Sequence, residues 1–545
     1  MSVTNDILSE IKTATANAPV CLRPNALVEP LIDQWYAWTH LIPPATCARN
    51  LTERHFRIMD SYIAAPQIHA SAVRNPKMLG GPFIDYNGGR VEEIKSLRCS
   101  TAAQRDYLVA LSKALADLDY VLQSHAKGES LHCLYPKIPD LLKGYVELVY
   151  DLNNHPSYRL IEPLLYRSNF YRTDSQSLML SRIVGDDRPF VLSTPRLPEP
   201  EALQLQLPFA SESLDYLFSS KREPKPYQEL VDRCCISGED EKIFSSLFVD
   251  HQPAPYARYQ GNGARWRYFG HACILLETPS MSLLFDPVLS YTYDSGISRY
   301  TYDDLPEKID YVVITHNHQD HVLLETLLQI RHKLGCVVVP RCGGGSLADP
   351  SLKLMLQTIG FRNVVELNEL ETLQLEPTSF LTGLPFMGEH ADLDIRSKLA
   401  YLVDLRGNKL LFAADSCNVE PALYRHLYHE IGDVRALFIG MECDGAPLSW
   451  LYGPLLTRQI ERSHDESRRL SGSNYVQAIE IVNLLHCREV FVYAMGQEPW
   501  LKYVMSIKYT PESNPIIQSN KFIEACRQRG MLAERLFGER EMRFD

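Results

Sequence analysis

The chain has little of what marks membrane, secreted or nucleic-acid-binding proteins. None of its apolar runs approaches the roughly 20 residues that a membrane-spanning helix needs. Its 55 Lys and Arg are outnumbered by 67 Asp and Glu, and the net charge of −12 argues against a general affinity for nucleic acid or anionic membranes. Residues 1–6 are polar and lack a basic stretch followed by an apolar one, so no signal peptide is expected. A cytoplasmic protein is therefore predicted.

Several reactive-site patterns are also absent. The 13 cysteines include no C-x-x-C pair, which argues against a zinc-ribbon site, and most are expected to be reduced core residues. The G-x-S-x-G elbow of many serine hydrolases does not occur. Residues 342–346 contain three glycines but lack the Lys-Ser/Thr ending of a phosphate-binding loop. The chemistry is therefore expected to come from other side chains.

The length of 545 residues indicates two or three domains, because a single core rarely grows that large. Two prolines and two glycines punctuate residues 252–263, and the domain boundary is placed there, between residues 257 and 258. Residues 1–257 are predicted to form a mostly helical α+β domain. Two of its leucine-rich stretches, 108–122 and 141–152, have the three- and four-residue spacing of a helix face.

In residues 258–545, short apolar runs alternate with helix-length segments. This alternation of strand-length and helix-length segments predicts an α/β domain with mixed sheets and helices packed outside them. The apolar runs cover residues 265–278, 281–285, 309–314, 336–339, 398–403, 410–414, 434–439 and 489–493, and the expected helices cover 322–334, 352–359, 421–430 and 475–486.

The most informative residues directly follow the apolar run 309–314. His316, His318, Asp320 and His321 place four metal-ligand side chains within six residues, where a buried strand is expected to end. Imidazole and carboxylate groups are common ligands of divalent transition metals. A single ion rarely takes four ligands from so short a turn, so the spacing suits two ions. One would face His316 and His318, and the other would face Asp320 and His321.

Three further segments carry ionisable side chains at expected strand ends. Because loops at strand ends commonly build sites, these side chains are predicted to gather near the metal motif. They are His271 and Asp286 on either side of the first hairpin, Glu389 and His390 after a strand that ends near residue 386, and Asp415 after the strand 410–414.

These motifs together resemble the metallo-β-lactamase superfamily over about residues 260–510. The resemblance implies an αββα sandwich with a two-metal site, in which Asp286 orients a metal-bound histidine and His271 supports the site without binding metal. Hydrolytic members normally carry one more histidine after the last strand of the sandwich. Here the strand 490–493 runs into Ala494, while His486 precedes the strand and should point away.

The missing histidine and the additional Glu389 make the chain similar to the diiron β-hydroxylases of nonribosomal peptide assembly, the chloramphenicol-pathway β-hydroxylase family. That branch also has a long N-terminal domain. Adjacent His390 could replace Glu389 as ligand, and this alternative stays open. The resemblance implies Glu389 and Asp415 as catalytic residues, with Asp415 bridging the metals, and an iron ligand set of His316, His318, Asp320, His321, Glu389 and Asp415.

The resemblance implies an O2-dependent diiron monooxygenase of antibiotic biosynthesis. It would hydroxylate the β-carbon of an amino acid tethered as a thioester to a peptidyl carrier domain of a nonribosomal peptide synthetase, with electrons from an unidentified donor. A homodimer is expected, and the N-terminal domain is the expected region for dimerisation and carrier docking. The three carboxylates favour iron, because hard oxygen donors stabilise the ferric state. The alternative is a dizinc hydrolase of the same fold, acting on a phosphodiester, thioester or lactone.

Residues 440–474 are a long segment near the expected site. Within it, Trp450 and Tyr452 either line a substrate channel or anchor the loop. Four arginines follow, and they either meet an acidic helix of the carrier or lie on a solvated helix with interleaved acidic residues: Arg458, Arg462, Arg468 and Arg469.

Overall fold

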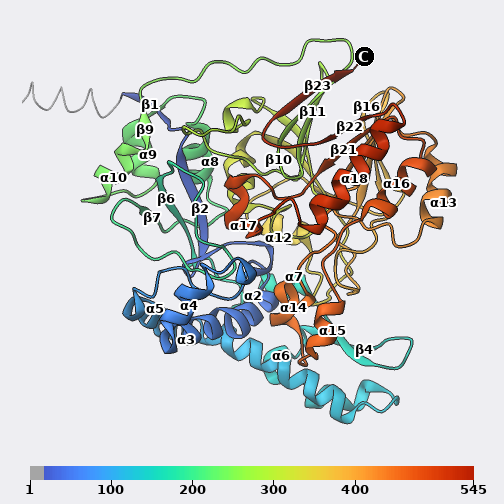
Figure 1. The fold of residues 1–545 in the computed structure, drawn as a ribbon. Helices are drawn as coiled ribbons and strands as arrows, with labels where there is room; N and C mark the ends of the chain where they lie inside the picture. Colours follow the sequence, from blue (N-terminus) through green and yellow to red (C-terminus); the bar gives the residue numbers. More distant parts are fainter. Residues whose placement is uncertain (1–17, 545) are drawn as a thin grey trace, which may run out of the picture.

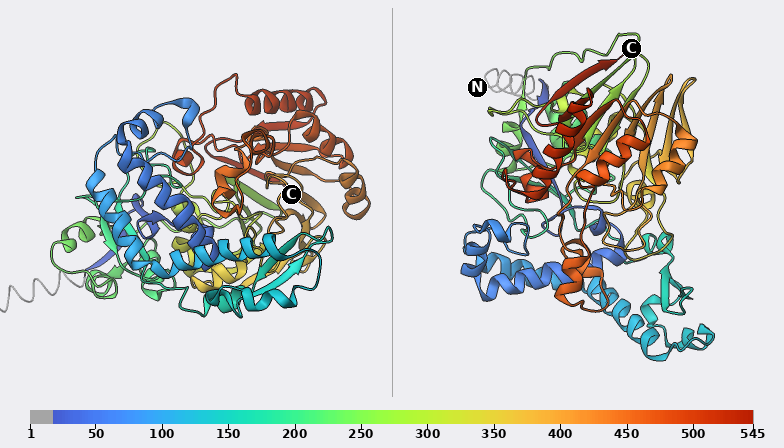
Figure 2. Two further views of the ribbon diagram at one scale, coloured as in Figure 1. Left: turned by 90° about the horizontal axis from the view of Figure 1, so that it is seen from below. Right: turned by 45° about the vertical axis from the view of Figure 1, so that its right-hand side comes forward.

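Two seven-stranded β-sheets face each other in the computed structural model, which describes residues 18–544 (Figures 1 and 2). The strand orders are β15-β14-β13-β12-β11-β10-β23 and β16-β17-β18-β19-β20-β21-β22. None of the described helices is both long and apolar enough to cross a bilayer.

The expectation of no signal peptide concerns residues 1–6, which lie outside the described part of the chain.

The first sheet is antiparallel at one side and parallel at the other. Strands β12 to β15 pair in parallel, and most of their side chains are buried, as expected for strands covered on both faces. Helices α11 (Leu324–Ile330) and α12 (Leu352–Thr358) connect these strands. The strands are β10 (Ala264–Gly270), β11 (Cys273–Glu277), β12 (Ser282–Phe285), β13 (Ile309–Val313), β14 (Leu334–Pro340), β15 (Val364–Leu367) and β23 (Arg540–Phe544).

The second sheet carries three helices on its outer face, α13 (Ala422–Ile431), α16 (Tyr475–Leu484) and α18 (Asn514–Gln528), joined to it by a shared apolar cluster. Its inner face packs against the first sheet. The strands are β16 (Thr372–Glu376), β17 (Ser379–Leu384), β18 (Ala400–Leu405), β19 (Asn408–Phe412), β20 (Ala436–Gly440), β21 (Glu489–Tyr493) and β22 (Leu532–Arg535).

Aromatic side chains fill the space between the two sheets. Phe285 of β12 stacks on Phe412 of β19 with ring centroids 4.0 Å apart, and Phe412 stacks in turn on Phe438 of β20 at 4.7 Å. Trp266 meets Phe438 edge-on at 5.2 Å. Such contacts add directional preference to the hydrophobic effect. With helices outside both sheets, the arrangement is the predicted αββα sandwich.

The N-terminal part combines helices with small sheets. The predicted helix over 108–122 is α6 (Asp106–His125), whose leucines are buried. Two of the sheets have the orders β3-β2-β6-β7 and β8-β1-β9. The remaining elements are β1 (Pro19–Leu22), β2 (Ala26–Ile32), β3 (Trp35–Tyr36), α2 (Pro44–Asn50), α3 (Arg57–Ala64), α4 (Pro66–Ala72), α5 (Val91–Gln104), α7 (Glu162–Tyr166), β6 (Gln176–Arg182), β7 (Leu203–Leu205), α8 (Glu212–Ser219), β8 (Lys225–Pro226), α9 (Tyr227–Arg233), α10 (Asp240–Ser246) and β9 (Phe248–Val249).

The prediction of a helix over residues 141–152 is wrong. A short 3-10 turn at Asp140–Leu142 leads into a hairpin of β4 (Val146–Tyr150) and β5 (Pro156–Leu160). Valine and tyrosine favour strands, and Asn154 takes the left-handed backbone conformation (φ 60°) that a tight turn requires. These local preferences outweigh a leucine spacing that also fits a helix.

A buried ionic network joins the N-terminal part to the sandwich. The Arg188 guanidinium donates to Glu29 of β2 at 2.8 Å and to Glu325 of α11 at 2.7 Å. Tyr36 donates to the same Glu325 carboxylate at 2.8 Å, and Arg188 lies 3.5 Å from the Tyr503 ring centroid. All three charged side chains are under 10% exposed, and Arg196 also pairs with Glu29 at 3.0 Å, so the buried carboxylates depend on these guanidinium groups for charge compensation.

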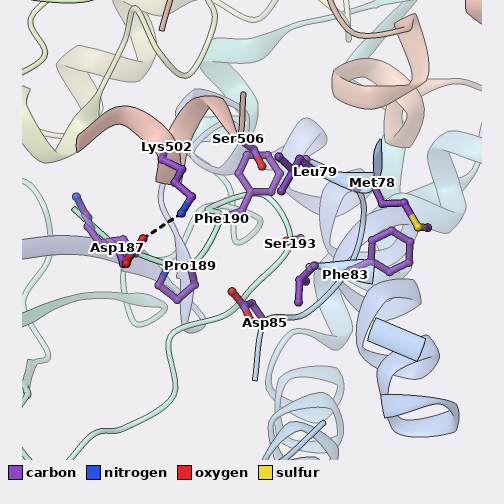
Figure 3. Close-up of a pocket in the computed structure, with 14 residues that line it drawn as sticks. Met78, Leu79, Phe83, Asp85, Asp187, Pro189, Phe190, Ser193, Lys502 and Ser506 are labelled. Atoms are coloured by element: carbon purple, nitrogen blue, oxygen red, sulfur yellow. Dashed lines mark hydrogen bonds and ion pairs between the residues drawn. The ribbon is translucent and has the colours of Figure 1, made fainter. Parts of the chain in front are cut away.

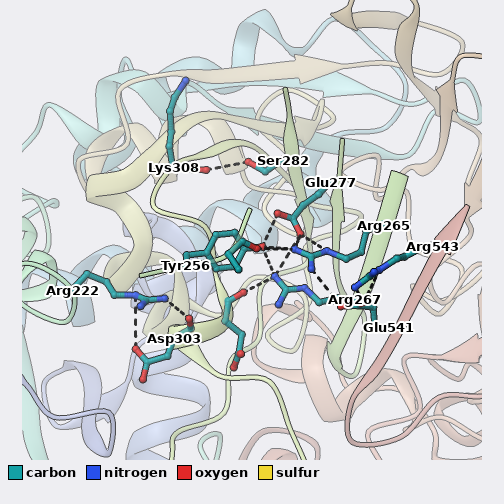
Figure 4. Close-up of polar contacts among 12 residues, drawn as sticks. Arg222, Tyr256, Arg265, Arg267, Glu277, Ser282, Asp303, Lys308, Glu541 and Arg543 are labelled. Carbon is teal, nitrogen blue, oxygen red and sulfur yellow. Dashed lines mark hydrogen bonds and ion pairs between the residues drawn. The ribbon is translucent and has the colours of Figure 1, made fainter. Parts of the chain in front are cut away.

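The segment 250–263 contains no helix or strand. Its Tyr256 donates to Glu277 of β11 at 2.6 Å, beside the ion pair of Glu277 with Arg265 at 2.7 Å (Figure 4). Arg267 donates to the Tyr256 hydroxyl at 2.5 Å. This cluster fastens the connecting segment to the first sheet. The domain division at residues 257/258 stays a prediction.

Replacing Arg188 with methionine should destabilise the protein by about 3–5 kcal/mol, because Glu325 would remain buried without its guanidinium partner, while Glu29 would keep only its ion pair with Arg196 at 3.0 Å. Urea unfolding measures the change. The matched control is Arg362→Met, which breaks an exposed ion pair with Glu212 (3.1 Å) that also links the two halves. This variant should lower the free energy of unfolding by less than about 1 kcal/mol. Equal losses in the two variants would contradict the role given to the buried network.

Candidate metal centre

The predicted ligands come together at one edge of the sandwich, where strands of both sheets end. The H-x-H-x-D-H residues follow β13 and precede α11. Asp415 lies three residues beyond β19, and Glu389 lies in the loop between β17 and β18. The strand-end loops therefore bring residues 316–321, 389 and 415 together, as predicted from their positions after apolar runs. All six residues are at most 9% exposed.

One group of donors consists of His316, His318 and Glu389. His316 Nε2 lies 3.2 Å from His318 Nδ1, and His318 Nδ1 lies 3.1 Å from Glu389 Oε1. A second group consists of His316, His321 and Asp415, in which Asp415 Oδ2 lies 2.9 Å from His321 Nε2 and 3.8 Å from His316 Nε2. His316 is common to both groups.

Asp320 belongs to a third group of donors. Its Oδ2 lies 3.7 Å from His321 Nε2 and 3.1 Å from His271 Nε2. His271 was expected to support the site without binding metal; it is buried, and its ring centroid lies 4.9 Å from that of His321. Its position beside Asp320 agrees with a supporting role but also gives it a nitrogen within the donor cluster.

The chemistry of this cluster suits divalent metal ions. Burial lowers the pKa of His318 to about 4, so its ring is neutral and available as a ligand at pH 7. Burial, with the neighbouring Asp415 and Asp320, raises the pKa of Glu389 well above its ordinary value. Asp415 Oδ1 is buried without a hydrogen-bond partner. Crowded carboxylates and an unpartnered buried oxygen are costly without a cation between them.

Hydrogen bonds fix the orientation of two of the histidines. Asp286 accepts from His321 Nδ1 at 2.8 Å, which is the contact predicted for it, and also from Thr315. His318 Nε2 lies 2.9 Å from the Tyr452 hydroxyl. Such partners determine which ring nitrogen faces a metal and hold the ring in place. Tyr452 therefore contacts the centre directly, which its sequence position alone did not reveal.

His390 lies against the histidine rings rather than among the donor atoms. Its ring centroid is 4.5 Å from that of His318, both of its nitrogens are buried without partners, and it joins none of the three donor groups within residues 18–544. Of the two alternatives for this loop, Glu389 is the side chain with an oxygen beside His318.

The turns that carry the site are conformationally strained. His271, Asp286, Glu389 and Ala414 all have positive φ angles, of 51°, 36°, 65° and 46°. Residues with a Cβ rarely adopt this region, and such strain concentrates where the surrounding structure fixes a functional geometry.

Ala494 directly follows β21, at the strand end where the resemblance to hydrolytic members implies one more histidine. Ala494 lines a cavity of about 480 Å³ together with Asp320, Glu389 and Asp415. His486 is exposed and pairs with Asp433 at 2.9 Å, so it points away from the centre as predicted. One side of the donor cluster consequently faces the cavity.

Other parts of the chain close over this cavity. Trp450 of α14 (Leu448–Tyr452) lines it and donates from Nε1 to the Gly80 carbonyl at 2.9 Å, and Gly80 with Leu79 brings the N-terminal part into the wall. The two interpretations of this segment therefore both apply to Trp450, which lines the cavity and anchors α14 to Gly80, whereas Tyr452 is buried and does not line the cavity. A second cavity of about 360 Å³ shares Leu79, Gly80 and Ser506 with the first, and the ion pair of Lys502 with Asp187 (3.0 Å) lies at its edge (Figure 3).

The arginines of the same segment differ in their surroundings. Arg468 is half-buried and donates to the Ala391 carbonyl at 2.9 Å, so it holds the loop that carries Glu389. Arg469 donates to the Gly445 carbonyl and pairs with Glu466. Arg458 and Arg462 are exposed, and Arg462 is the first residue of α15 (Arg462–Ser467). Arg462 Nε lies 3.9 Å from Glu466 Oε1, whereas Arg458 forms no hydrogen bond or ion pair among the described residues.

Comparison with known proteins shows to which family the chain belongs. The chain matches the diiron non-heme β-hydroxylase N-terminal domain over residues 21–253 and the β-lactamase superfamily domain over residues 282–444. It is 41% identical over 531 residues to the 4-amino-L-phenylalanyl-[CmlP-peptidyl-carrier-protein] 3-hydroxylase of Streptomyces venezuelae, across 96% of this chain and 99% of the relative. The chain belongs to the diiron non-heme β-hydroxylase family.

The crystal structure of CmlA, a diiron β-hydroxylase from Streptomyces venezuelae, has a TM-score of 0.91 to this chain at 41% identity, covering 97% of this chain and 100% of that one. The predicted family and the predicted fold class, a metallo-β-lactamase sandwich behind a helical α+β N-terminal domain, are therefore confirmed. A metallo hydrolase from Ignicoccus hospitalis is 16% identical with a TM-score of 0.35 over 52% of the chain, which carries no information about activity.

Replacing Tyr452 with phenylalanine should weaken metal binding about 10- to 100-fold, because His318 would lose the partner that fixes its ring. Competition with a chelator at equilibrium measures the affinity. The matched control is Tyr62→Phe, which removes a buried tyrosine hydroxyl that donates to the Gly89 carbonyl at 2.6 Å in the N-terminal part. Unchanged affinity in Tyr452→Phe would show that packing alone orients His318.

Proposed function

We propose that this diiron β-hydroxylase uses O2 to hydroxylate the β-carbon of an amino acid held as a thioester on a peptidyl carrier domain of a nonribosomal peptide synthetase. The observation that carries the proposal is the convergence of His316, His318, Asp320, His321, Glu389 and Asp415 at one cavity. Support also comes from the Streptomyces venezuelae relative, whose name describes 3-hydroxylation of a carrier-bound aminoacyl group.

In the proposed assignment, His316, His318, Glu389 and Asp415 would hold one iron, and Asp320, His321 and Asp415 would hold the other. The iron pair, once reduced, supplies the oxygen chemistry that a protein side chain cannot perform. Asp415 is the shared ligand because it lies near both His316 and His321. Glu389 and Asp415 are the proposed catalytic carboxylates.

The chain's own residues position the reactants and control water. Asp286 and Tyr452 hold the rings of His321 and His318 through hydrogen bonds. The small side chain of Ala494 leaves the cavity side of the centre open, where a hydrolase would place another ligand. Binding of the tethered group in the cavity excludes water from the reacting carbon, which limits side reactions.

A dizinc hydrolase is the second function that the motif allows. The substitution of Ala494 for the last histidine and the position of Glu389 among the donors both favour the hydroxylase. No feature of the described residues specifically favours hydrolysis.

Carrier recognition belongs to the same proposal, since the tethered group must reach the cavity. The exposed Arg458 and Arg462 remain available for an acidic carrier helix, whereas Arg468 is engaged with the Ala391 carbonyl. A homodimer, an unidentified electron donor and a cytoplasmic location are further parts of this proposal.

Protein purified without chelator should contain about two irons per chain. After reduction and exposure to air, intact-mass measurement of candidate aminoacyl carrier proteins should show the gain of one oxygen atom on one of them. Two zincs with no iron, together with hydrolysis of a phosphodiester, thioester or lactone, would replace the proposal with the hydrolase.

The Glu389 assignment predicts different results for two neighbouring variants. Glu389→Ala should lose iron and lower hydroxylation roughly 100-fold or more, because a ligand is removed. His390→Phe keeps a ring against His318 and should retain two irons. Iron analysis and the diferric absorption band measure both. Loss of iron in His390→Phe with retention in Glu389→Ala would transfer the ligand role to His390.

A further inference from the structure

A glutamate outside the proposed ligand set lies in the wall of the active-site cavity. Glu442 follows β20 by two residues and lines the cavity together with Glu389 and Asp415. Its backbone is fixed, because the Gly472 N–H donates to its carbonyl at 2.8 Å, and its Oε1 accepts from the Asp444 N–H at 3.2 Å. The other carboxylate oxygen, Oε2, is buried and has no hydrogen-bond partner among the described residues.

Two more unpartnered polar atoms line the same cavity. Gln319 is 4% exposed and its Oε1 has no partner, and the buried hydroxyl of Tyr509 has none. Buried polar groups are normally satisfied, so three such atoms in one wall indicate a ligand with hydrogen-bond donors. Of the two basic residues in the wall, Arg469 is engaged with Gly445 and Glu466, while Lys508 is exposed.

The proposed substrate carries a donor group of this kind. In an aminoacyl thioester, the amine and the β-carbon are attached to the same α-carbon and lie only about 2.5 Å apart. A β-carbon placed at the metal centre therefore brings the ammonium group beside it. An ammonium has three N–H donors and one positive charge, which matches an acceptor-rich wall with an uncompensated carboxylate.

We infer that Glu442 binds the α-ammonium group of the carrier-bound amino acid and thereby selects aminoacyl groups over acyl or peptidyl groups that lack a free amine. The inference rests on the proposed function. Gln319 and Tyr509 supply further acceptors in the same wall.

The electrostatic surroundings agree with this role. Burial, together with Asp444, Glu389 and Asp415, raises the pKa of Glu442 to about 8. A neighbouring ammonium favours the charged carboxylate, and the carboxylate favours the charged amine, so binding stabilises both ions. A substrate without the amine leaves the carboxyl group unpaired in the cavity wall, which disfavours that substrate.

The test compares two carrier proteins, one loaded with the amino acid that the wild-type enzyme hydroxylates and one with its desamino analogue. Wild-type enzyme should prefer the aminoacyl carrier by about 10- to 100-fold in kcat/KM, the range expected for a hydrogen bond to a charged group. Glu442→Gln should reduce this ratio to within a fewfold of one, by losing activity on the aminoacyl carrier alone. Its iron content and diferric absorption should stay unchanged.

The matched control is Glu512→Gln, which removes the same charge at an exposed position beside the cavity residue Ser513 and should keep the wild-type ratio. An unchanged ratio in Glu442→Gln overturns the inference, and so does loss of iron, which would place Glu442 in the metal centre. Equal turnover of both carriers by the wild-type enzyme overturns it without any variant. Absence of turnover on every aminoacyl carrier instead contradicts the proposed function.

Discussion

The stacking of Phe285 on Phe412 across the two sheets is the contact on which the metal centre depends. Phe285 directly precedes Asp286, which holds His321, and Phe412 lies three residues before Asp415. A ring separation of 4.0 Å therefore fixes the distance between the turns that carry these two aspartates. Because protein interiors are closely packed, a change in this pair would shift one set of donors relative to the other.

Much of the fold and site could be predicted because the relevant signals are local. The alternation of apolar runs predicted a mixed-sheet α/β domain, and the spacing of His316 to His321 predicted a two-metal motif at a strand end. The αββα sandwich came from the resemblance of these motifs to the metallo-β-lactamase superfamily. The roles of Tyr452 and Arg468 depend on contacts between residues distant in sequence, here 134 and 77 positions apart. Spacing within one segment contains no information about such contacts. The prediction of a helix over 141–152 was wrong for a related reason. Its leucine spacing fits a helix as well as a strand, and the strand forms because residues 146–150 pair with residues 156–160 in the hairpin.

The same sandwich supports hydrolysis or oxidation depending on what surrounds its metal edge. In this chain, Ala494 opens the centre toward the cavity, and Glu389 adds an oxygen donor. The N-terminal part then supplies Leu79 and Gly80, and α14 closes over them through Trp450. The strained turns at Asp286 and Glu389 are held by these surroundings, because an isolated loop would relax from such backbone conformations.

The donors come from loops of both sheets, spread over about a hundred positions of the chain. An unfolded chain cannot gather them, so the donor cluster exists only once both sheets of the sandwich have packed together. The cavity that Ala494 lines reaches His318, Asp320, Glu389 and Asp415, so the same opening can admit both a metal ion and a tethered substrate to them.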